Sequence, residues 1–335
     1  MSGSTERCPR SGVRRRAALA GMAVALAFAA GAGSAQQWPA KPVRLIVPFP
    51  AGGNTDLVAR AFSTRFAETF GQQFVIDNRG GANTIVGAEL AARAAPDGHT
   101  LFLTTATTMT NNVVLYRKLP YDPKTAFALI SMAVVFPYVI AVHPSVPARS
   151  VKELVALSKA QPGRLAYGTS GSGSSGHIAG ALFETMAGVR WTHIPYKGSA
   201  GATMDAIGGQ IPMVITGIAS IAGQAQGGKL RVLGVCSEKR LTHWPDIPTI
   251  AESGYPGYVG ITWFGFVAPA GTPKPVIDRV QGEVVRVGAL PDVRERLQSQ
   301  GFELMTGTPE QFADFIAKEL ARVTKVVDAA GIRIE

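Results

Sequence analysis

The sequence KPVRLIVPFPAGGNTDLVARAF, residues 41–62, joins an apolar run to an amphipathic segment through a loop of small residues. Residues 43–47 are mostly apolar, which predicts a buried strand. Beyond the loop, apolar side chains recur at helical spacing, so we expect a helix over about residues 55–69. A strand, a glycine-rich loop and a helix in this order predict the first βα unit of a parallel sheet.

The same alternation continues along the chain and then restarts after about residue 140. Further strands are expected near residues 74–77, 100–104, 136–142, 164–167, 191–194, 213–215, 230–235 and 261–267. Further helices are expected near residues 85–94, 151–160, 177–187, 202–207, 275–287, 291–300 and 309–330, and a polar loop over residues 105–112. The pattern predicts an α/β fold of two lobes, each with a doubly wound, mostly parallel sheet.

The last helices carry apolar faces and need a sheet to cover, and the first lobe is the natural host. The chain would then cross between lobes twice, near residues 138–142 and 259–264, which implies a hinge and a cleft. We therefore expect lobe 1 over residues 36–140 plus 262–335, and lobe 2 over residues 141–261.

The first 35 residues have the features of a signal peptide. Five arginines precede the uncharged stretch 17–32, and small residues end at Ala35. That stretch of about 16 residues is short for a membrane span, which needs roughly 20. We expect cleavage near Ala35 and a periplasmic protein. An uncleaved anchor and export by the twin-arginine route are the alternatives.

Charge and cysteine content exclude several classes of function. The net charge is +10, but residues 1–35 contribute +4, which leaves +6 for the other 300 residues. No cluster of lysine and arginine remains, so no nucleic-acid partner is expected. After cleavage Cys236 is the one cysteine left, which rules out an intrachain disulfide or a cysteine-based metal site. We expect no metal and no cofactor, and a monomer.

Two loops share a design that suits an anionic ligand. Residues 51–56 and 169–177 each follow an expected strand, are rich in Gly and small polar residues, and open a helix. Glycine lets a ligand approach the backbone, and a helix start presents unpaired N–H donors with partial positive charge. One such loop in each lobe predicts a clamp for a small organic anion without a cationic side chain. Plain turn formation and N-capping is the alternative for each loop.

The second loop also allows two other functions. Gly171, Gly173 and Gly176 form a G-x-G-x-x-G pattern, typical of dinucleotide binding, but no acidic residue follows about 20 positions later. An NADP-type nucleotide site is therefore the second hypothesis. Ser174 or Ser175 with His177 is a conceivable nucleophile and base, yet no G-x-S-x-G elbow is present and we expect no enzyme.

Motifs along the whole of residues 38–335 resemble the Bug family, the extracytoplasmic solute-binding proteins of tripartite tricarboxylate transporters. They include PFPAGG at 48–53, DNR at 77–79, PDG at 96–98, LPYDP at 119–123, GSGS at 171–174, PYKG at 195–198, GGQ at 208–210, PDIPT at 245–249, APAGTP at 268–273 and AAGI at 329–332. The resemblance implies a periplasmic two-lobe fold that closes on its ligand. It implies small carboxylates held by backbone amides of the two loops, often through ordered water. It also implies delivery to a membrane transporter for some members, and a sensor kinase is the alternative partner.

One departure affects the expected site, because Asn83-Thr84 stand where the family usually has further glycines. The candidate ligand-binding residues lie in the two loops, in the polar segment 105–112, and on the two following units. They are Phe49, Ala51, Gly52, Gly53, Asn54, Asp56, Thr107, Thr108, Ser170, Gly171, Ser172, Gly173, Ser174, Ser175, Tyr196 and Asp205. Asp56 is expected to cap its helix, to accept from ligand or ordered water, or to fix the loop, and Tyr196 to supply a flat wall.

Overall fold

The computed structural model describes residues 3–4 and 38–332. The described residues from 41 onward belong to one compact unit. The expected signal peptide, residues 1–35, lies almost entirely outside the described residues. Within the described part of the chain, no helix combines the length and the apolar character needed to cross a membrane.

One half of the sheet starts with the segment that opens the fold. Strand β1 (Val43–Val47) lies between β2 (Phe74–Asn78) and β3 (Thr100–Thr105), and all three are parallel. Helices α2 (Asn54–Phe70) and α3 (Ile85–Ala92) connect them, as the alternation of apolar periods predicted. These expected elements are confirmed to within two residues at each end.

The polar segment after β3 is not the expected loop. Residues Thr107–Asn111 form a π-helical turn, η1, which continues into α4 (Asn112–Leu115). Its threonines and asparagines are buried because their polar atoms are bonded internally. The Thr110 hydroxyl donates to the Ala106 carbonyl at 2.7 Å, for example. Polar composition predicted a loop here, and that prediction is wrong.

The other half of the sheet repeats the βα pattern. Its parallel strands are β5 (Ala166–Thr169), β6 (Thr192–Pro195) and β7 (Met213–Gly217). The helices are α5 (Val151–Ala160), α6 (Ser175–Ala187), α7 (Ser199–Ile207), the 3-10 turn η2 (Ile218–Ser220) and α8 (Ala222–Gln226). The sequence did not predict η2 and α8, because elements of three to five residues are too short to show a helical period.

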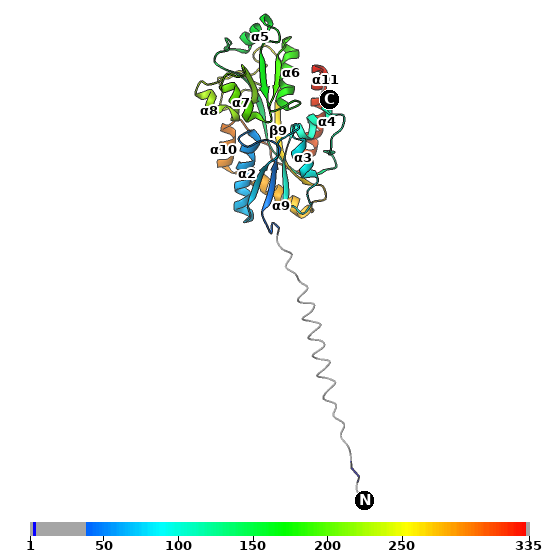
Figure 1. Cartoon of the computed structure of the whole chain (residues 1–335). Coiled ribbons are helices and arrows are strands. Elements are labelled where there is room, and N and C mark those ends of the chain that lie inside the picture. Colours follow the sequence, from blue (N-terminus) through cyan, green and yellow to red (C-terminus); the bar gives the residue numbers. More distant parts are fainter. Residues whose placement is uncertain (1–2, 5–37, 333–335) are drawn as a thin grey trace. The chain divides into compact units, whose positions relative to one another are not determined.

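Two long antiparallel strands join the halves. Strand β4 (Phe127–Val142) pairs with β9 (Ile261–Pro269) along its first part and with β7 and β8 (Arg231–Val235) along its last five residues. The sheet order is therefore β2-β1-β3-β9-β4-β7-β5-β6. Figure 1 shows β9 between the half with α2 and α9 and the half with α5, α6 and α7. Strand β4 ends at Val142 and strand β9 starts at Ile261, and these two positions fall in the stretches 138–142 and 259–264 where the chain crossings were expected.

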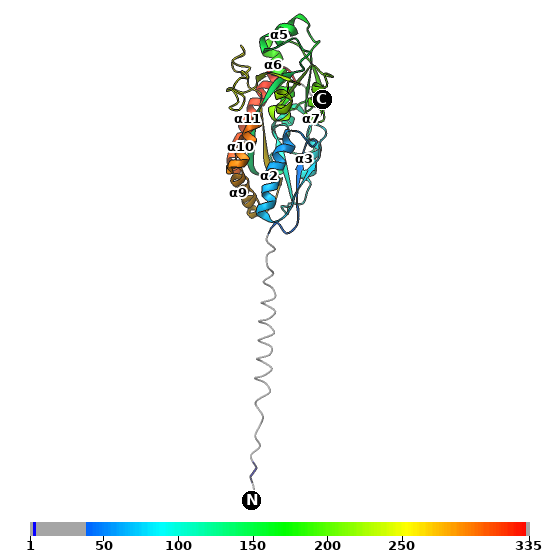
Figure 2. The ribbon, with the colours of Figure 1, turned by 90° about the vertical axis from the view of Figure 1, so that its left-hand side faces the viewer.

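The last part of the chain adds helices to both faces of the first half. It consists of α9 (Lys274–Ala289), α10 (Pro291–Ser299), the short β10 (Glu303–Leu304) and α11 (Pro309–Ala330). Figure 2 shows α9 and α10 beside α2, and Arg65 of α2 pairs with Asp292 of α10. Helix α11 lies on the opposite face, where Phe312 shares a buried cluster with Ala88 and Ala91 of α3. Helix α11 starts with a capping box between Thr308 and Gln311 and packs against both β4 and α6, so it also touches the second half.

A cluster of buried rings holds α2 to this sheet. Phe266 on β9 is fully buried, with ring centroids 5.2 Å from Phe62 and 5.5 Å from Phe66. Such tilted ring pairs contribute beyond their buried area. The amphipathic face that the sequence placed on this helix is thus the face that packs.

Replacing Phe266 with Ala should lower the free energy of unfolding by about 3–5 kcal/mol, because a large buried ring is lost and a cavity stays behind. Phe266→Leu should cost less, since most of the apolar volume remains. Urea unfolding followed by circular dichroism measures both, with Val285→Ala on the exposed face of α9 as the control. A loss below about 1 kcal/mol for Phe266→Ala would contradict the assignment of this cluster to the core.

Candidate functional site

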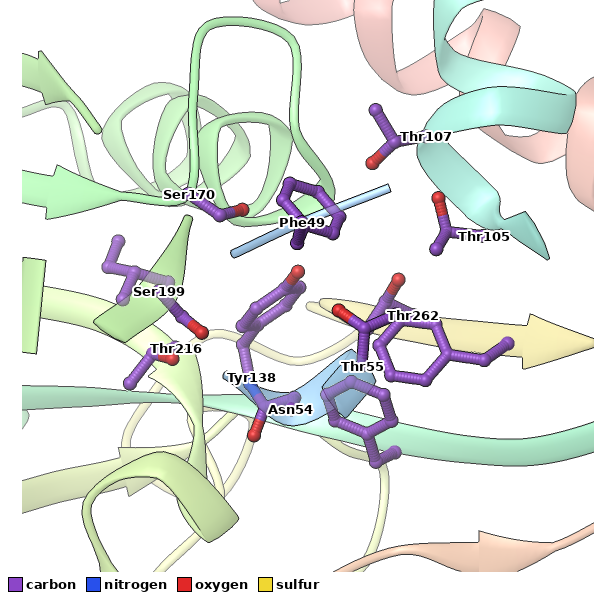
Figure 3. A pocket seen from close by; sticks show the side chains of 13 residues that line it. Phe49, Asn54, Thr55, Thr105, Thr107, Tyr138, Ser170, Ser199, Thr216 and Thr262 are labelled. Carbon is purple, nitrogen blue, oxygen red and sulfur yellow. The ribbon is translucent and has the colours of Figure 1, made fainter. Parts of the chain in front are cut away.

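A pocket lies where the two halves of the sheet meet (Figure 3). Thirteen residues line it: Phe49, Asn54, Thr55, Thr105, Thr107, Phe136, Tyr138, Ser170, Ser199, Ile215, Thr216, Thr262 and Phe264. The unfilled space among them is about 410 Å³, part of it continuous with solvent. Nine of these side chains are polar, four are apolar, and none of the thirteen is charged. Any ion bound here would be held by neutral donors.

Two helices begin at the pocket without a side-chain cap. The N-cap of α2 is Gly53 and that of α7 is Gly198, and glycine offers no capping oxygen. The first backbone N–H groups of a helix have no partner within the helix and carry partial positive charge. Asn54 and Ser199, the first residues of α2 and α7, both line the pocket. Two helix starts without a side-chain cap therefore lie at one space.

Helix α6, at the second glycine-rich loop, is different. The Ser174 hydroxyl accepts from the backbone N–H of His177 at 3.3 Å and so caps this helix itself. Ser170 is the residue of this loop that lines the pocket. The starts of α2 and α7 thus reach the pocket through Asn54 and Ser199, whereas the second loop reaches it through Ser170 and the start of α6 is capped by its own Ser174.

One hydroxyl in the pocket lacks a partner. The Oγ1 atom of Thr216 is buried and has no hydrogen-bond partner among the described residues. Thr216 stands near the carboxyl end of β7, where ligands bind in open α/β sheets. An unpaired buried hydroxyl costs free energy unless something else bonds to it. This atom is therefore placed to meet a ligand.

The crossing strands form the floor of the pocket. Phe136 and Tyr138 come from β4, and Thr262 and Phe264 come from β9. Figure 3 shows the Tyr138 hydroxyl near the middle of the lining residues. Burial raises the pKa of Tyr138 well above its usual value, although hydrogen bonds with Thr262, Gly176 and Ser175 lower it. The hydroxyl thus keeps its proton and can donate it.

Asp56 supports the first loop from behind. Its carboxylate accepts from the Gly52 backbone N–H at 3.1 Å, from Arg60 Nε at 2.8 Å and from Asn78 Nδ2 at 3.3 Å. Burial by itself would raise the pKa of Asp56, but these hydrogen bonds outweigh it and hold the pKa below the usual value. Asp56 is therefore ionised, paired and used to hold the loop.

The structure separates the sixteen candidate residues. Phe49, Asn54, Thr107 and Ser170 line the pocket. The others lie beside it or beyond it: Ala51, Gly52, Gly53, Asp56, Thr108, Gly171, Ser172, Gly173, Ser174, Ser175, Tyr196 and Asp205. Tyr196 Oη donates to Asp205 Oδ2 at 2.6 Å, so these two side chains are bonded to each other. The Thr108 hydroxyl donates to Thr84 Oγ1 at 2.9 Å.

Residues of the lining that sequence reasoning did not single out come mainly from strands. They are Thr55, Thr105, Phe136, Tyr138, Ser199, Ile215, Thr216, Thr262 and Phe264. A signal existed for several of them, because the expected chain crossings include Tyr138 and Thr262 and the expected strand at 213–215 ends just before Thr216. Which face of each strand points to the pocket was not readable from the sequence.

The geometry does not support the alternatives built on the second loop. The backbone N–H groups of Gly171 and Gly173 already donate to Thr169 Oγ1 and His177 Nδ1, so they do not form an open cradle for a pyrophosphate. The His177 ring accepts from backbone, and Ser174 caps the helix, so neither is set up as base and nucleophile. Within the described residues, no group of three or more His, Cys, Asp or Glu side chains could hold a metal ion.

The fold and this uncharged pocket suit a solute-binding protein. Residues 58–332 match the model of a family described as the tripartite tricarboxylate transporter family receptor. The chain belongs to this family, a family of solute receptors and not of enzymes. The resemblance to the Bug proteins is confirmed.

Relatives extend over nearly the whole chain. Protein BugT of Bordetella pertussis is 34% identical, over 96% of this chain and 99% of BugT. The structure of R. palustris Rpa4515 with adipate is 36% identical with a TM-score of 0.87, over 88% of this chain and 99% of Rpa4515. MatC from Rhodopseudomonas palustris with bound malate is 30% identical with a TM-score of 0.82, over 87% of this chain and 100% of MatC.

Asp56→Asn should destabilise the protein at neutral pH, because the neutral amide loses the charge-assisted bonds from Arg60 and Gly52. The expected loss is about 1.5–3 kcal/mol at pH 7. The stability given by a carboxyl with a lowered folded-state pKa is present above its unfolded pKa and disappears as pH falls through the folded value. Urea unfolding at pH 7 and at pH 3 should therefore show the difference between variant and wild type shrinking in acid; an equal difference at both pH values would contradict this role.

Proposed function

We propose that the pocket captures a small carboxylate, with short dicarboxylates as the favoured class. One observation carries the proposal: two uncapped helix starts and the partnerless Thr216 hydroxyl face the same uncharged space. Carboxylate oxygens accept hydrogen bonds, and backbone N–H groups at helix starts are suited to them. The bound adipate of Rpa4515 and malate of MatC are consistent with this class.

The arrangement of the lining supports a ligand with two polar ends. In Figure 3, Ser170, Ser199 and Thr216 lie on one side, and Thr105, Thr107 and Thr262 lie on the other. The rings of Phe49 and Tyr138 lie between these two groups in the same view, and Phe136 and Phe264 also line the pocket. Hydroxyl groups at both ends with rings between them suit a chain of carbon atoms that carries a carboxylate at each end.

Capture would depend on the closing of two lobes. We assign lobe 1 to residues 36–140 plus 262–335 and lobe 2 to residues 141–261, with the hinge where β4 and β9 run side by side. Several side-chain hydrogen bonds cross between these lobes. Ser220 Oγ donates to Asn54 Oδ1 at 2.8 Å, and Asn111 Nδ2 donates to the Gly173 carbonyl at 3.2 Å and lies 3.1 Å from Ser175 Oγ. Thr262 Oγ1 also donates to Ser175 Oγ at 3.2 Å. Bonds of this kind would hold the closed form around a ligand and break when the cleft opens.

Location and partners follow from the family and the first residues. We propose that the chain is exported, that cleavage after Ala35 leaves Gln36 as the first residue, and that the periplasmic monomer delivers its ligand to a tripartite membrane transporter or to a sensor kinase. The basic residues and the apolar stretch before Ala35 support export.

The intact mass of the protein isolated from a periplasmic fraction should correspond to a chain that begins at Gln36. A mass that still contains residues 1–35 would overturn cleavage and favour an anchor.

Thermal unfolding with a panel of carboxylates tests the ligand class. A carboxylate at 100 times its Kd should raise the free energy of unfolding by about 2.7 kcal/mol. NADP should leave the transition unchanged. A shift with NADP and none with mono-, di- or tricarboxylates would replace the proposal with the nucleotide hypothesis.

Thr216→Val tests the partnerless hydroxyl with little change of shape. The lost bond to a charged ligand should cost about 1.5–3 kcal/mol, which is roughly tenfold or more in Kd. Thr203→Val is the matched control, because Thr203 Oγ1 is also buried without a described partner but does not line the pocket. Isothermal titration should show weakened binding in Thr216→Val alone; equal affinities in both variants would remove Thr216 from the site.

A further inference from the structure

Two histidines stack beneath the second glycine-rich loop. The ring of His177, on α6, lies 3.9 Å from the ring of His193, on β6, with an angle of 11° between their planes. Tyr167, on β5, also packs against His193, with a centroid distance of 5.1 Å. Three consecutive elements of one lobe thus place these rings at the base of the loop.

Both rings bond to the loop. His177 Nδ1 accepts from the Gly173 backbone N–H at 3.0 Å. His193 Nε2 lies 2.7 Å from Thr169 Oγ1. The Thr169 hydroxyl in turn accepts from the Gly171 backbone N–H and from Ser174 Oγ, both at 3.3 Å. The loop from Thr169 to Ser174 is therefore tied down at two points by imidazole nitrogens.

The bond at Gly173 requires a neutral histidine. An imidazole nitrogen accepts a hydrogen bond only when it carries no proton, so His177 holds its proton on Nε2. Burial lowers the pKa of His177 to about 4, and burial together with the neighbouring His177 lowers the pKa of His193 to about 3. Both rings are uncharged at neutral pH, which is also what allows them to stack.

Gly173 links this support to the cleft. Its φ of 77° is left-handed, which glycine adopts without strain. Its N–H is held by His177 in lobe 2, while its carbonyl accepts from Asn111 on η1, in lobe 1. Ser170, three residues earlier in the same loop, lines the pocket. A shift of the backbone at Gly173 would therefore disturb the hydrogen bond from Asn111 and move Ser170 in the pocket lining.

We propose that His177 is a positioning residue for ligand capture: stacked on His193, it accepts the Gly173 N–H and so holds the loop in the shape that completes the pocket. This inference rests on the proposed function, because its consequence is a change in ligand affinity. His177 does not line the pocket and acts through the loop. Simple core packing of two rings is the competing explanation.

The two explanations predict opposite effects on ligand affinity for a matched pair of His177 variants. His177→Phe keeps a ring on His193 and removes the acceptor. His177→Asn removes the ring, but its Oδ1 can stand where Nδ1 stood and accept from Gly173. His243→Phe, at an exposed position outside the pocket, controls for the loss of a histidine. If His177 positions the loop, the His177→Asn variant should keep ligand affinity and His177→Phe should lose it. If His177 only packs, His177→Phe should keep affinity.

The experiment combines affinity with hydrogen exchange of the unliganded protein. Adipate and malate are the probes, measured by isothermal titration at pH 7. We expect His177→Phe to weaken binding about tenfold or more, and His177→Asn to stay within about threefold of wild type. Exchange of the Gly173 amide, followed by NMR, should quicken about tenfold in His177→Phe and much less in His177→Asn.

Each outcome decides a separate point. Full affinity and unchanged Gly173 exchange in His177→Phe would overturn the positioning role while leaving carboxylate capture intact. Failure of the wild type to bind either probe would count against the proposed function, and the exchange data would still decide whether His177 holds the loop. Nitrogen-15 spectra of the histidine rings give a further check: a proton on His177 Nδ1 at pH 7 would overturn the inference without any ligand.

Discussion

The antiparallel pairing of β4 with β9 is the interaction on which the rest of the structure depends. It joins two parallel half-sheets into one sheet, and it places residues more than a hundred positions apart in register, such as Phe136 beside Thr262. Because side chains alternate along a strand, one face of this pair can serve the pocket while the other packs. Phe136 lines the pocket, and its ring also packs against Phe302 with a centroid distance of 4.9 Å.

A second constraint is that the pocket holds no charged side chain. A cation buried there would need constant pairing, whereas hydroxyls and helix starts can face an empty or a filled pocket at smaller cost. The nearby charge of Asp56 would oppose an anion, but Arg60 pairs with it at 2.8 Å. The net positive charge of the chain thus has no direct part in the lining.

The loop that most resembles a nucleotide site shows how one motif can serve different purposes. Gly171 and Gly173 of the G-x-G-x-x-G pattern have left-handed φ angles that suit glycine, yet their N–H groups are bonded to Thr169 and His177. A glycine-rich motif of this kind therefore indicates a backbone conformation that favours glycine, and by itself it does not indicate which ligand binds. The bonding of each N–H group decides which donors remain for anything else.

The sequence alone determined the strands and helices with clear periods, the family, and the loop that begins at Phe49. Those features are local: a run of five apolar residues or a helical stripe has the same meaning wherever it packs. It did not determine that residues 107–111 form a buried turn, because a polar side chain is compatible with a loop or with an internal network.

Only the tertiary structure decided which helix starts face the pocket, that Ser174 caps α6 while α7 starts on a glycine, and that Tyr138 and Thr216 point into the same space as Asn54. These relations depend on how two half-sheets meet at β4 and β9. The physical reason is that a pocket is made by residues distant in the chain, whose meeting is fixed by packing and strand register and not by any local preference.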